Sequence, residues 1–340
     1  MKTIFIGDSE IGKGRTYIIA EIGSNHTRDL EIAYATIDAA VSAGVDAVKF
    51  QSLQLNELYI NPSDNISELH RKIDLPEEWH RPLMEYCNRK GVHFFSAPTY
   101  LSSVDILEET GVLLYKLASA QIGTFPQIVR KVARIGKPVI ISTGLVTEDS
   151  LAEVVEVFRQ EGNDKLIILH CNSIYPAPYD RISLPLIERY RERFQVLTGF
   201  SDHTEDHTAA IAAVTKGACV LEKHFTLSRL LPTPDAPFAL EPDEMKNYVD
   251  EIRKTEAALK FIPRDNIQPE ESAFKQRILY RLVLKTPISK GEVITSEMVN
   301  FLRTDQGIDA RDFDKAGNKG IALRDLEAGL IPSDAIQLTK

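Results

Sequence analysis

The sequence predicts an α/β fold, namely a (β/α)8 TIM barrel followed by a small β-rich domain. Three observations support this prediction. Eight short apolar runs lie between residues 17 and 225, helical patterns separate them, and from residue 278 the pattern changes to short runs broken by Gly, Pro and Asp. A doubly wound open sheet is the alternative, but the glycine-rich phosphate turn expected after its first strand is missing.

The eight apolar runs are rich in β-branched and aromatic residues and do not alternate cleanly with polar ones. This is typical of strands that are buried on both faces. In chain order the predicted strands are YIIAE (17–21), AVKFQ (47–51), HFFSAP (93–98), YKLAS (115–119), PVIISTG (138–144), LIILHC (166–171), LTGFSD (197–202) and VLEKHF (220–225).

The stretches between these runs carry helical signals. In the stretch 30–44 apolar residues recur along one helical stripe, Asp29 is a plausible N-cap, and Gly44 can end the helix. The stretch that follows Thr147 repeats this pattern and ends at Gly162.

The later part of the chain predicts the domain organisation. LEPDEMKNYVDEIRKTEAALKF (240–261) is expected to form the final helix of a barrel domain over residues 1–262. The polar, proline-containing segment 263–277 is expected to be a linker, and residues 278–340 to form the β-rich domain.

Composition and charge limit the class of protein. With 43% hydrophobic and 26% charged residues, the chain has the composition of an ordinary soluble globular protein. No segment approaches the ~18 continuous apolar residues of a membrane helix, and MKTIFIGDSE lacks a signal-peptide pattern. We therefore expect a cytoplasmic protein without a membrane partner. The net charge of −9 argues against nucleic acid as a partner, and the three cysteines are expected to be reduced thiols.

Nearly every predicted strand ends in polar or charged residues, and in a barrel these carboxyl ends converge on the face that holds the active site. The residues are Glu21, Asn25 and His26; Lys49 and Gln51; Lys116 and Ser119; Ser142, Thr143 and Gly144; His170, Asn172 and Ser173; Asp202 and His203; and Lys223 and His224. Because a carboxylate is rarely buried without partners, Glu21 is best explained as one member of a polar ring.

His203 and His224 close the last two predicted strands. Neutral imidazole is a common ligand of Mn²⁺, Zn²⁺ and Fe²⁺, and two histidines would leave positions open for water and substrate oxygens. The alternative is that each histidine only forms a hydrogen bond with a neighbouring loop. Spacing alone does not decide between the two.

Lys49 and Lys116 end the second and fourth predicted strands. With the nearby Ser119, Ser142 and Gly144 they offer the charges, hydroxyls and loop N–H groups of a phosphate or carboxylate site. Two alternatives remain open. In one, the lysines pair with Glu21 or Asp46 inside the barrel; in the other, Lys116 acts as a Schiff-base nucleophile, as in lysine-dependent aldolases.

The stretch NSIYPAPYD (172–180) contains two prolines and is predicted to be a stiff loop. A rigid loop over the active face can place Ser173 and Tyr175 against a ligand. An ordinary turn between a strand and a helix is the alternative.

Taken together, the motifs EIGSNH, VKFQ, YKLAS, ISTG, YPAP, FSDHT and LEKHFT resemble, in order and spacing, those of the sialic acid synthase family. The resemblance covers almost the whole chain. PISKGEVITSEMV and FLRTDQGI are similar to the antifreeze-like (SAF) domain that follows the barrel in this family.

The resemblance implies a metal-dependent condensation of phosphoenolpyruvate (PEP) with the aldehyde of an N-acylated hexosamine such as N-acetylmannosamine. It implies that His203 and His224 bind Mn²⁺, that Lys49, Gln51, Lys116, Ser119 and Ser142 hold PEP, that Glu21 lies near the aldehyde, and that Asp235 contacts sugar hydroxyls. It also implies a homodimer with exchanged C-terminal domains, in which Arg303 reaches the active site of the partner subunit.

Four positions depart from the family pattern. Gln121 stands where an acid is common, Ser173 where N-acetylneuraminate synthases often have Asn, Ala97 replaces a Thr, and Thr304 replaces a Pro. We keep Gln121 among the expected substrate-binding residues. N-acetylneuraminate is the expected product, with legionaminic- or pseudaminic-type acids as alternatives because lost hydroxyl contacts change sugar preference. A non-catalytic sugar-binding protein is a further alternative, which would release no phosphate from PEP.

Overall fold

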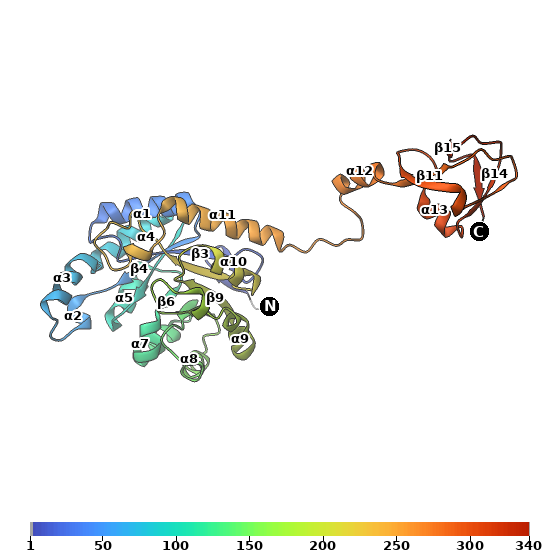
Figure 1. Cartoon of the computed structure of the whole chain (residues 1–340). Helices are drawn as coiled ribbons and strands as arrows, with labels where there is room; N and C mark the ends of the chain where they lie inside the picture. The colour runs from blue at the N-terminus through green and yellow to red at the C-terminus, as the bar shows by residue number, and fades with distance from the viewer. Residues whose placement is uncertain (1–2, 340) are drawn as a thin grey trace. The chain divides into compact units, whose positions relative to one another are not determined.

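The computed structural model describes residues 3–339, so Met1, Lys2 and Lys340 lie outside the described residues. The chain divides into two compact units, residues 1–260 and 261–340 (Figure 1). Each unit has a hydrophobic core of its own.

The first unit contains an eight-stranded parallel sheet ringed by helices, in which the two strands at the ends of the pairing order, β5 and β6, are in contact. The strands pair in the order β5-β4-β3-β10-β9-β8-β7-β6. They are β3 (Tyr17–Gly23), β4 (Ala47–Ser52), β5 (His93–Pro98), β6 (Tyr115–Leu117), β7 (Val139–Ser142), β8 (Leu166–Cys171), β9 (Leu197–Asp202) and β10 (Val220–His224). All eight predicted strands are present, which confirms the predicted barrel.

Helices follow the strands along the chain, as the alternating pattern predicts. They are α1 (Leu30–Ala43), α2 (Leu55–Leu58), α3 (Asp64–Ile73), α4 (His80–Lys90), α5 (Leu101–Thr110), α6 (Ser119–Thr124), α7 (Pro126–Ile135), α8 (Glu148–Gln160), α9 (Pro185–Phe194), α10 (Thr208–Thr215) and α11 (Pro242–Ala258). Short 3₁₀ turns lie at Glu77–Trp79, Tyr179–Arg181 and Ala236–Phe238.

The predicted helix caps are in place. The Asp29 side chain accepts from two backbone N–H groups in the first turn of α1, and Gly44 ends that helix in the left-handed conformation at φ 87°. Thr147 caps α8 through the N–H of Ser150. Gly162, with φ 71°, lies just after the C-cap of α8. These local signals fix where each helix begins and ends, and therefore how the strand ends are joined.

The interior of the barrel is apolar at its amino-terminal end. A hairpin of β1 (Ile4–Ile6) and β2 (Ser9–Ile11) contributes Ile4, Ile6 and Ile11 to a cluster with strand residues such as Tyr17 and Ile19. Each isoleucine buried in this way stabilises the fold by roughly 1.5–3 kcal/mol. Because this cluster fills one end of the barrel, the polar residues are left at the other, carboxyl-terminal end.

The second unit is β-rich, as predicted. It contains two three-stranded sheets, β13-β11-β15 and β12-β14-β16, around a core that includes Leu282 and Phe313. Its elements are α12 (Pro269–Arg277), β11 (Tyr280–Leu284), β12 (Val293–Thr295), a 3₁₀ turn at Ser296–Met298, β13 (Val299–Arg303), α13 (Ala310–Lys315), β14 (Lys319–Ala322), β15 (Gly329–Leu330) and β16 (Ile336–Leu338).

The segment expected to be a linker, 263–277, contains the helix α12. Pro269 occupies the first turn, where its missing N–H costs nothing, and Gln268 and Glu271 form a capping box around it. The proline thus starts a helix here and does not break one.

Within residues 3–339, no helix is both long enough and apolar enough to cross a membrane. The longest described helix, α11, has 17 residues and carries several charges along its length.

Candidate active site

A cavity of about 260 Å³ opens at the carboxyl-terminal mouth of the barrel. Most of the residues predicted to form the site line this cavity, although they come from distant parts of the chain. They are Glu21, Lys49, Gln51, Lys116, Ser119, Ser142, Ser173, Tyr175, His203 and His224. Cys171, Ser201 and Glu222, which were not among the predicted site residues, line the same cavity.

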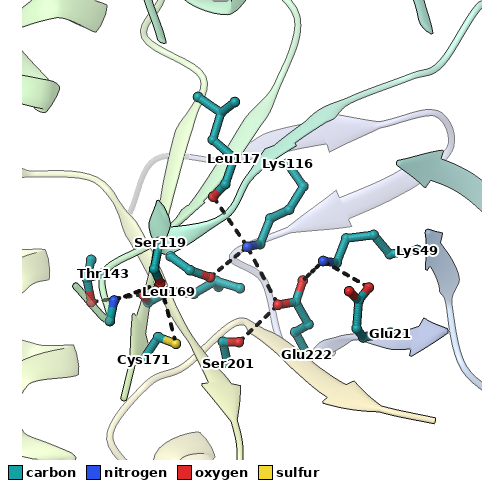
Figure 2. Close-up of polar contacts among 12 residues, drawn as sticks. Glu21, Lys49, Lys116, Leu117, Ser119, Thr143, Leu169, Cys171, Ser201 and Glu222 are labelled. Carbon is teal, nitrogen blue, oxygen red and sulfur yellow. Dashed lines mark hydrogen bonds and ion pairs between the residues drawn. The ribbon is translucent and has the colours of Figure 1, made fainter. Parts of the chain in front are cut away.

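A carboxylate joins the two lysines at the centre of the mouth (Figure 2). Glu222 lies 3.5 Å from the Lys49 Nζ and 3.6 Å from the Lys116 Nζ, one lysine near each carboxylate oxygen. The hydroxyl of Ser201 donates to Glu222 at 2.9 Å. A buried charge is tolerated only when it is paired and hydrogen-bonded in this way.

Each lysine has a further partner. The Lys49 Nζ lies 2.9 Å from Glu21, whose other oxygen accepts from the Gln51 amide at 2.6 Å. The Lys116 Nζ donates to the Ser142 hydroxyl at 2.6 Å. The alternative in which a lysine pairs with Glu21 therefore holds for Lys49, and the pair itself lines the cavity.

The second suggested lysine partner, Asp46, lies elsewhere. Its carboxylate pairs with Arg15 at 2.8 Å and with Arg253 at 2.9 Å, just before β4 begins. Asp46 therefore belongs to the amino-terminal end of the barrel and not to the mouth.

The two carboxyl groups beside Lys49 have opposite protonation preferences. Burial raises the pKa of Glu21 to about 7, although Lys49 opposes this rise. Burial also favours the neutral form of Glu222, but Lys116 and Lys49 together outweigh it and lower the pKa of Glu222 to about 2. Glu222 is thus an anion at neutral pH, whereas Glu21 can gain or lose a proton there.

The two predicted metal-binding histidines lie side by side, with ring centres 5.3 Å apart. Nδ1 of His203 lies 2.7 Å from the carbonyl oxygen of Asn172. A carbonyl only accepts, so this nitrogen carries a proton, and in the neutral ring Nε2 keeps its lone pair. Tyr175 packs against His203 with a ring separation of 4.3 Å.

His224 is buried, and its Nδ1 has no hydrogen-bond partner among the described residues. Burial, reinforced by the nearby His203, lowers the pKa of His224 well below its ordinary value, so the imidazole is neutral. Burial lowers the pKa of His203, but Cys171 and the Asn172 carbonyl outweigh it and raise that pKa above its ordinary value, so a metal would have to compete with a proton on His203. In their neutral forms the two imidazoles fit a divalent metal. Among residues 3–339 there is no group of three or more His, Cys, Asp or Glu side chains placed to hold one. A metal held here would have the histidine pair as its protein ligands, with other coordination positions open.

Four predicted substrate-binding residues do not line the cavity. Asp235 lies beside it, with Oδ2 3.8 Å from the His224 Nδ1. The Gly144 N–H donates to the Ser119 hydroxyl, and a Cβ at Gly144 would lie 2.3 Å from the Ser173 hydroxyl, so glycine permits this close approach. Gln121 lies on α6 with a buried Oε1 that has no partner among the described residues. Arg303 ends β13 in the second unit, where its guanidinium lies 5.2 Å from the centre of the Tyr280 ring.

Three residues predicted to lie in the polar ring at the mouth lie on the outer face of the barrel, and strand alternation explains why. Asp202 and Lys223 were expected at the mouth, but they form an ion pair on the opposite face of their strands, beside Tyr248 of α11. His170 likewise lies outside the barrel, where its Nε2 contacts the Ile182 carbonyl oxygen. Successive strand residues point to opposite faces, so only every second one reaches the interior.

The same alternation would have identified the missed residues. Glu222 lies two positions before His224, and Ser201 two positions before His203, so each shares the inward face of its histidine. The prediction took residues near the ends of the runs and did not follow this alternation inward to Glu222 and Ser201.

A parallel barrel whose mouth combines two lysines, several hydroxyls and a histidine pair is the architecture of a TIM-barrel enzyme. The chain belongs to the NeuB family, whose model matches residues 36–262. The resemblance to sialic acid synthases inferred from the sequence motifs is thereby confirmed.

Similar proteins cover nearly the full chain. It is 36% identical to the spore coat polysaccharide biosynthesis protein SpsE of Bacillus subtilis, over 99% of this chain and 98% of that protein. It is 33% identical to pseudaminic acid synthase of Campylobacter jejuni, over 93% of this chain and 94% of that protein. The crystal structure of N-acetylneuraminic acid synthetase from Leptospira borgpetersenii matches with a TM-score of 0.74 at 28% identity, covering 81% of this chain and 96% of that one.

Proposed function

We propose that the protein condenses PEP with the open-chain aldehyde of an N-acylated hexosamine and releases a nonulosonic acid and phosphate. One observation carries this proposal: in a member of the NeuB family, two lysines, four serines and a histidine pair line one cavity. N-acetylneuraminate is the product expected from the motifs. Legionaminic- and pseudaminic-type acids are the alternatives, and relatives at 32–34% identity carry the names of synthases for both.

In this proposal Lys49 and Lys116 hold the phosphate and carboxylate of PEP, with Ser119 and Ser142 as hydrogen-bond donors. The contact of Lys116 with Ser142 at 2.6 Å fixes the ammonium group before the substrate arrives. The negative charge of Glu222 favours the charged form of both ammonium groups, although burial outweighs it at Lys116 and lowers the pKa of that lysine. They then stabilise the charge that develops on the departing phosphate.

Mn²⁺ is the proposed cofactor, held by His203 and His224. When bound, it supplies a Lewis acid beside the aldehyde oxygen. Glu21 is placed for proton transfer at the same point, because it is the register partner of His224 on the adjacent strand and its pKa is about 7.

The proton balance of the reaction fits this assignment. Glu21 gives a proton to the aldehyde oxygen as C3 of PEP forms a bond to the aldehyde carbon, and regains one from the water that adds at C2. The bond between C2 and the phosphate oxygen then breaks as the new C2 hydroxyl passes its proton to the departing phosphate, so the 2-keto oxygen of the product comes from water.

The direct test is phosphate release from PEP and Mn²⁺ with a panel of acceptors. The panel contains N-acetylmannosamine and diacetamido-trideoxyhexoses of the legionaminic and pseudaminic series. Release with one class of acceptor, and its loss after chelation, is the expected result. An absence of phosphate release with every acceptor would reject the proposal.

Arg303→Ala tests the proposed contribution of the second unit in a domain-exchanged dimer. We expect a loss of about 10- to 100-fold in kcat/KM for the sugar, the worth of one charge-assisted hydrogen bond, with KM for PEP little changed. The arginine is exposed on β13, so its removal leaves no buried partner unpaired. Arg324→Ala, another exposed arginine of the same unit, is the matched control. Equal activity of the two variants would remove Arg303 from the site.

A Schiff-base aldolase using Lys116 is the second candidate, because burial lowers the pKa of this lysine toward the nucleophilic free amine. In that chemistry the two histidines have no role. Borohydride added with a carbonyl substrate would trap such an enzyme on Lys116, whereas chelation would silence the proposed synthase. Trapping without metal dependence would favour the aldolase.

A further inference from the structure

Four buried residues form a polar cluster on the outer face of β9 and β10, behind the histidine pair. The cluster, called here the Lys223 clamp, consists of Asp202, Thr204, Lys223 and Tyr248, and each residue is only 1% exposed. The Lys223 Nζ lies 3.2 Å from Asp202 Oδ2 and donates to the Thr204 carbonyl oxygen. The hydroxyl of Tyr248, on α11, donates to the same Asp202 oxygen at 3.2 Å.

The clamp holds the chain on both sides of His203. Asp202 Oδ1 accepts from the Thr204 N–H at 2.9 Å and from the Thr204 hydroxyl at 2.7 Å, which closes a tight turn around His203. Lys223 contacts residues 202 and 204 together. Because Lys223 directly precedes His224, the clamp joins the backbone around one histidine to the backbone beside the other.

The Lys223 clamp lies where the backbone pairing of β9 with β10 ends. The register of β9 with β10 ends at the pair of Asp202 and Lys223. His203 and His224 lie one residue beyond the paired segment, where no further register pair between these two strands is present in the described chain. Side chains of the clamp therefore connect the two strands at the position where the ladder stops.

The energetics indicate a role other than stability. Replacing a buried ion pair by apolar groups of similar size is often neutral or stabilising, because burial removes both charges from water. What such a pair provides is a defined geometry, since each charged atom needs its partners in fixed positions. Here the ion pair fixes the positions of Asp202 and Lys223, which directly precede His203 and His224.

We propose that Lys223 and Asp202 are positioning residues that hold His203 and His224 at the separation a divalent metal requires. Neither contacts the metal or the substrate, because both point away from the cavity. The inference rests on the metal site proposed above. It assigns a role to two charged residues that the reaction itself does not use.

The test compares Mn²⁺ affinity in the absence of substrate, measured from the electron paramagnetic resonance signal of the free ion. The main variant is the double replacement Asp202→Asn with Lys223→Met, which removes both charges together and leaves no buried ion unpaired. We expect its Kd for Mn²⁺ to rise about 10- to 100-fold, the range typical when residues that orient metal ligands are lost. Turnover should recover as Mn²⁺ is raised, with KM for PEP changed less than about twofold, because the lysines that hold PEP are untouched.

Arg253→Met is the matched control. It breaks the partly buried ion pair with Asp46 at the opposite end of the barrel, 2.9 Å long, and should leave the Mn²⁺ affinity unchanged. If the double variant does not fold, Thr204→Val removes one hydrogen bond to Asp202 and should weaken Mn²⁺ binding about threefold.

The outcomes separate this inference from the proposed function. A folded double variant, or a folded Thr204→Val protein, with wild-type Mn²⁺ affinity would overturn the inference and leave the metal site standing. Equal weakening in Arg253→Met would also overturn it, because the effect would then follow general stability. Wild-type protein that binds no Mn²⁺ would reject the metal site and this inference with it.

Discussion

His224→Ala is expected to abolish turnover while leaving the barrel folded. The variant removes one of two imidazoles and with it the Nδ1 that has no partner among the described residues. The described residues form no hydrogen bond with that atom, so none is lost there. The decrease in folding stability comes mainly from lost packing against His203, Tyr175 and Phe238. Lewis-acid stabilisation contributes several kcal/mol to a transition state, which corresponds to a loss of about a thousandfold or more in kcat.

Two measurements check this expectation. Phosphate release reports turnover, and Mn²⁺ binding to the free protein reports whether the ion is lost. His207→Ala is the matched control, because this imidazole lies at the start of α10 and contacts Asn247 away from the mouth. Full activity of His224→Ala with Mn²⁺ present would contradict the metal assignment.

The fold was predictable from the sequence because its signals are local. Buried parallel strands need continuous apolar runs, and helix ends need caps, so Asp29 and Gly44 could be assigned by inspection. The helix α12 was not predicted, although its signals are equally local. A capping box and an N-terminal proline are as local as any other helix signal, but the polar composition of the segment concealed them.

The site was only partly predictable, because its geometry depends on which face of each strand is inward. Lys49, Lys116, His203 and His224 were recognised from their places at strand ends. Glu222, the common partner of the two lysines, was not, although it lies two residues before His224. The local sequence does not predict a buried carboxylate at Glu222. Its charge is stable there only because two lysines from other strands converge on it.

Lys49→Met is expected to have the second large effect, on both stability and PEP binding. The Lys49 Nζ contacts Glu21 and Glu222 inside the barrel, where all three side chains are less than a tenth exposed. Removing the cation leaves two carboxylates close together with one positive partner fewer, and breaking such a buried pair costs roughly 3–5 kcal/mol. KM for PEP should rise about 10- to 100-fold, the worth of one charge-assisted hydrogen bond.

The pH dependence of this variant identifies the cause of its instability. With Lys49 absent, the pKa of Glu21 rises further above its unfolded value, because the cation that favoured its charged form is gone. A carboxyl with a raised folded pKa binds its proton more tightly in the folded state. Stability is therefore lost as pH rises above the ordinary glutamate range. Lys49→Met should thus be closest to wild type in urea unfolding near pH 5 and furthest from it near pH 8.

The paired variant Lys49→Met with Glu21→Gln separates folding from binding. It removes one positive and one negative charge together, and the glutamine can still accept from Gln51, which donates to Glu21 at 2.6 Å. We expect most of the lost free energy of unfolding to return and the stability difference between pH 5 and pH 8 to shrink. PEP affinity should stay low, because the ammonium group is still missing. If the paired variant regained PEP binding, Lys49 would serve only to neutralise Glu21, and the substrate contact would fall to Lys116 alone.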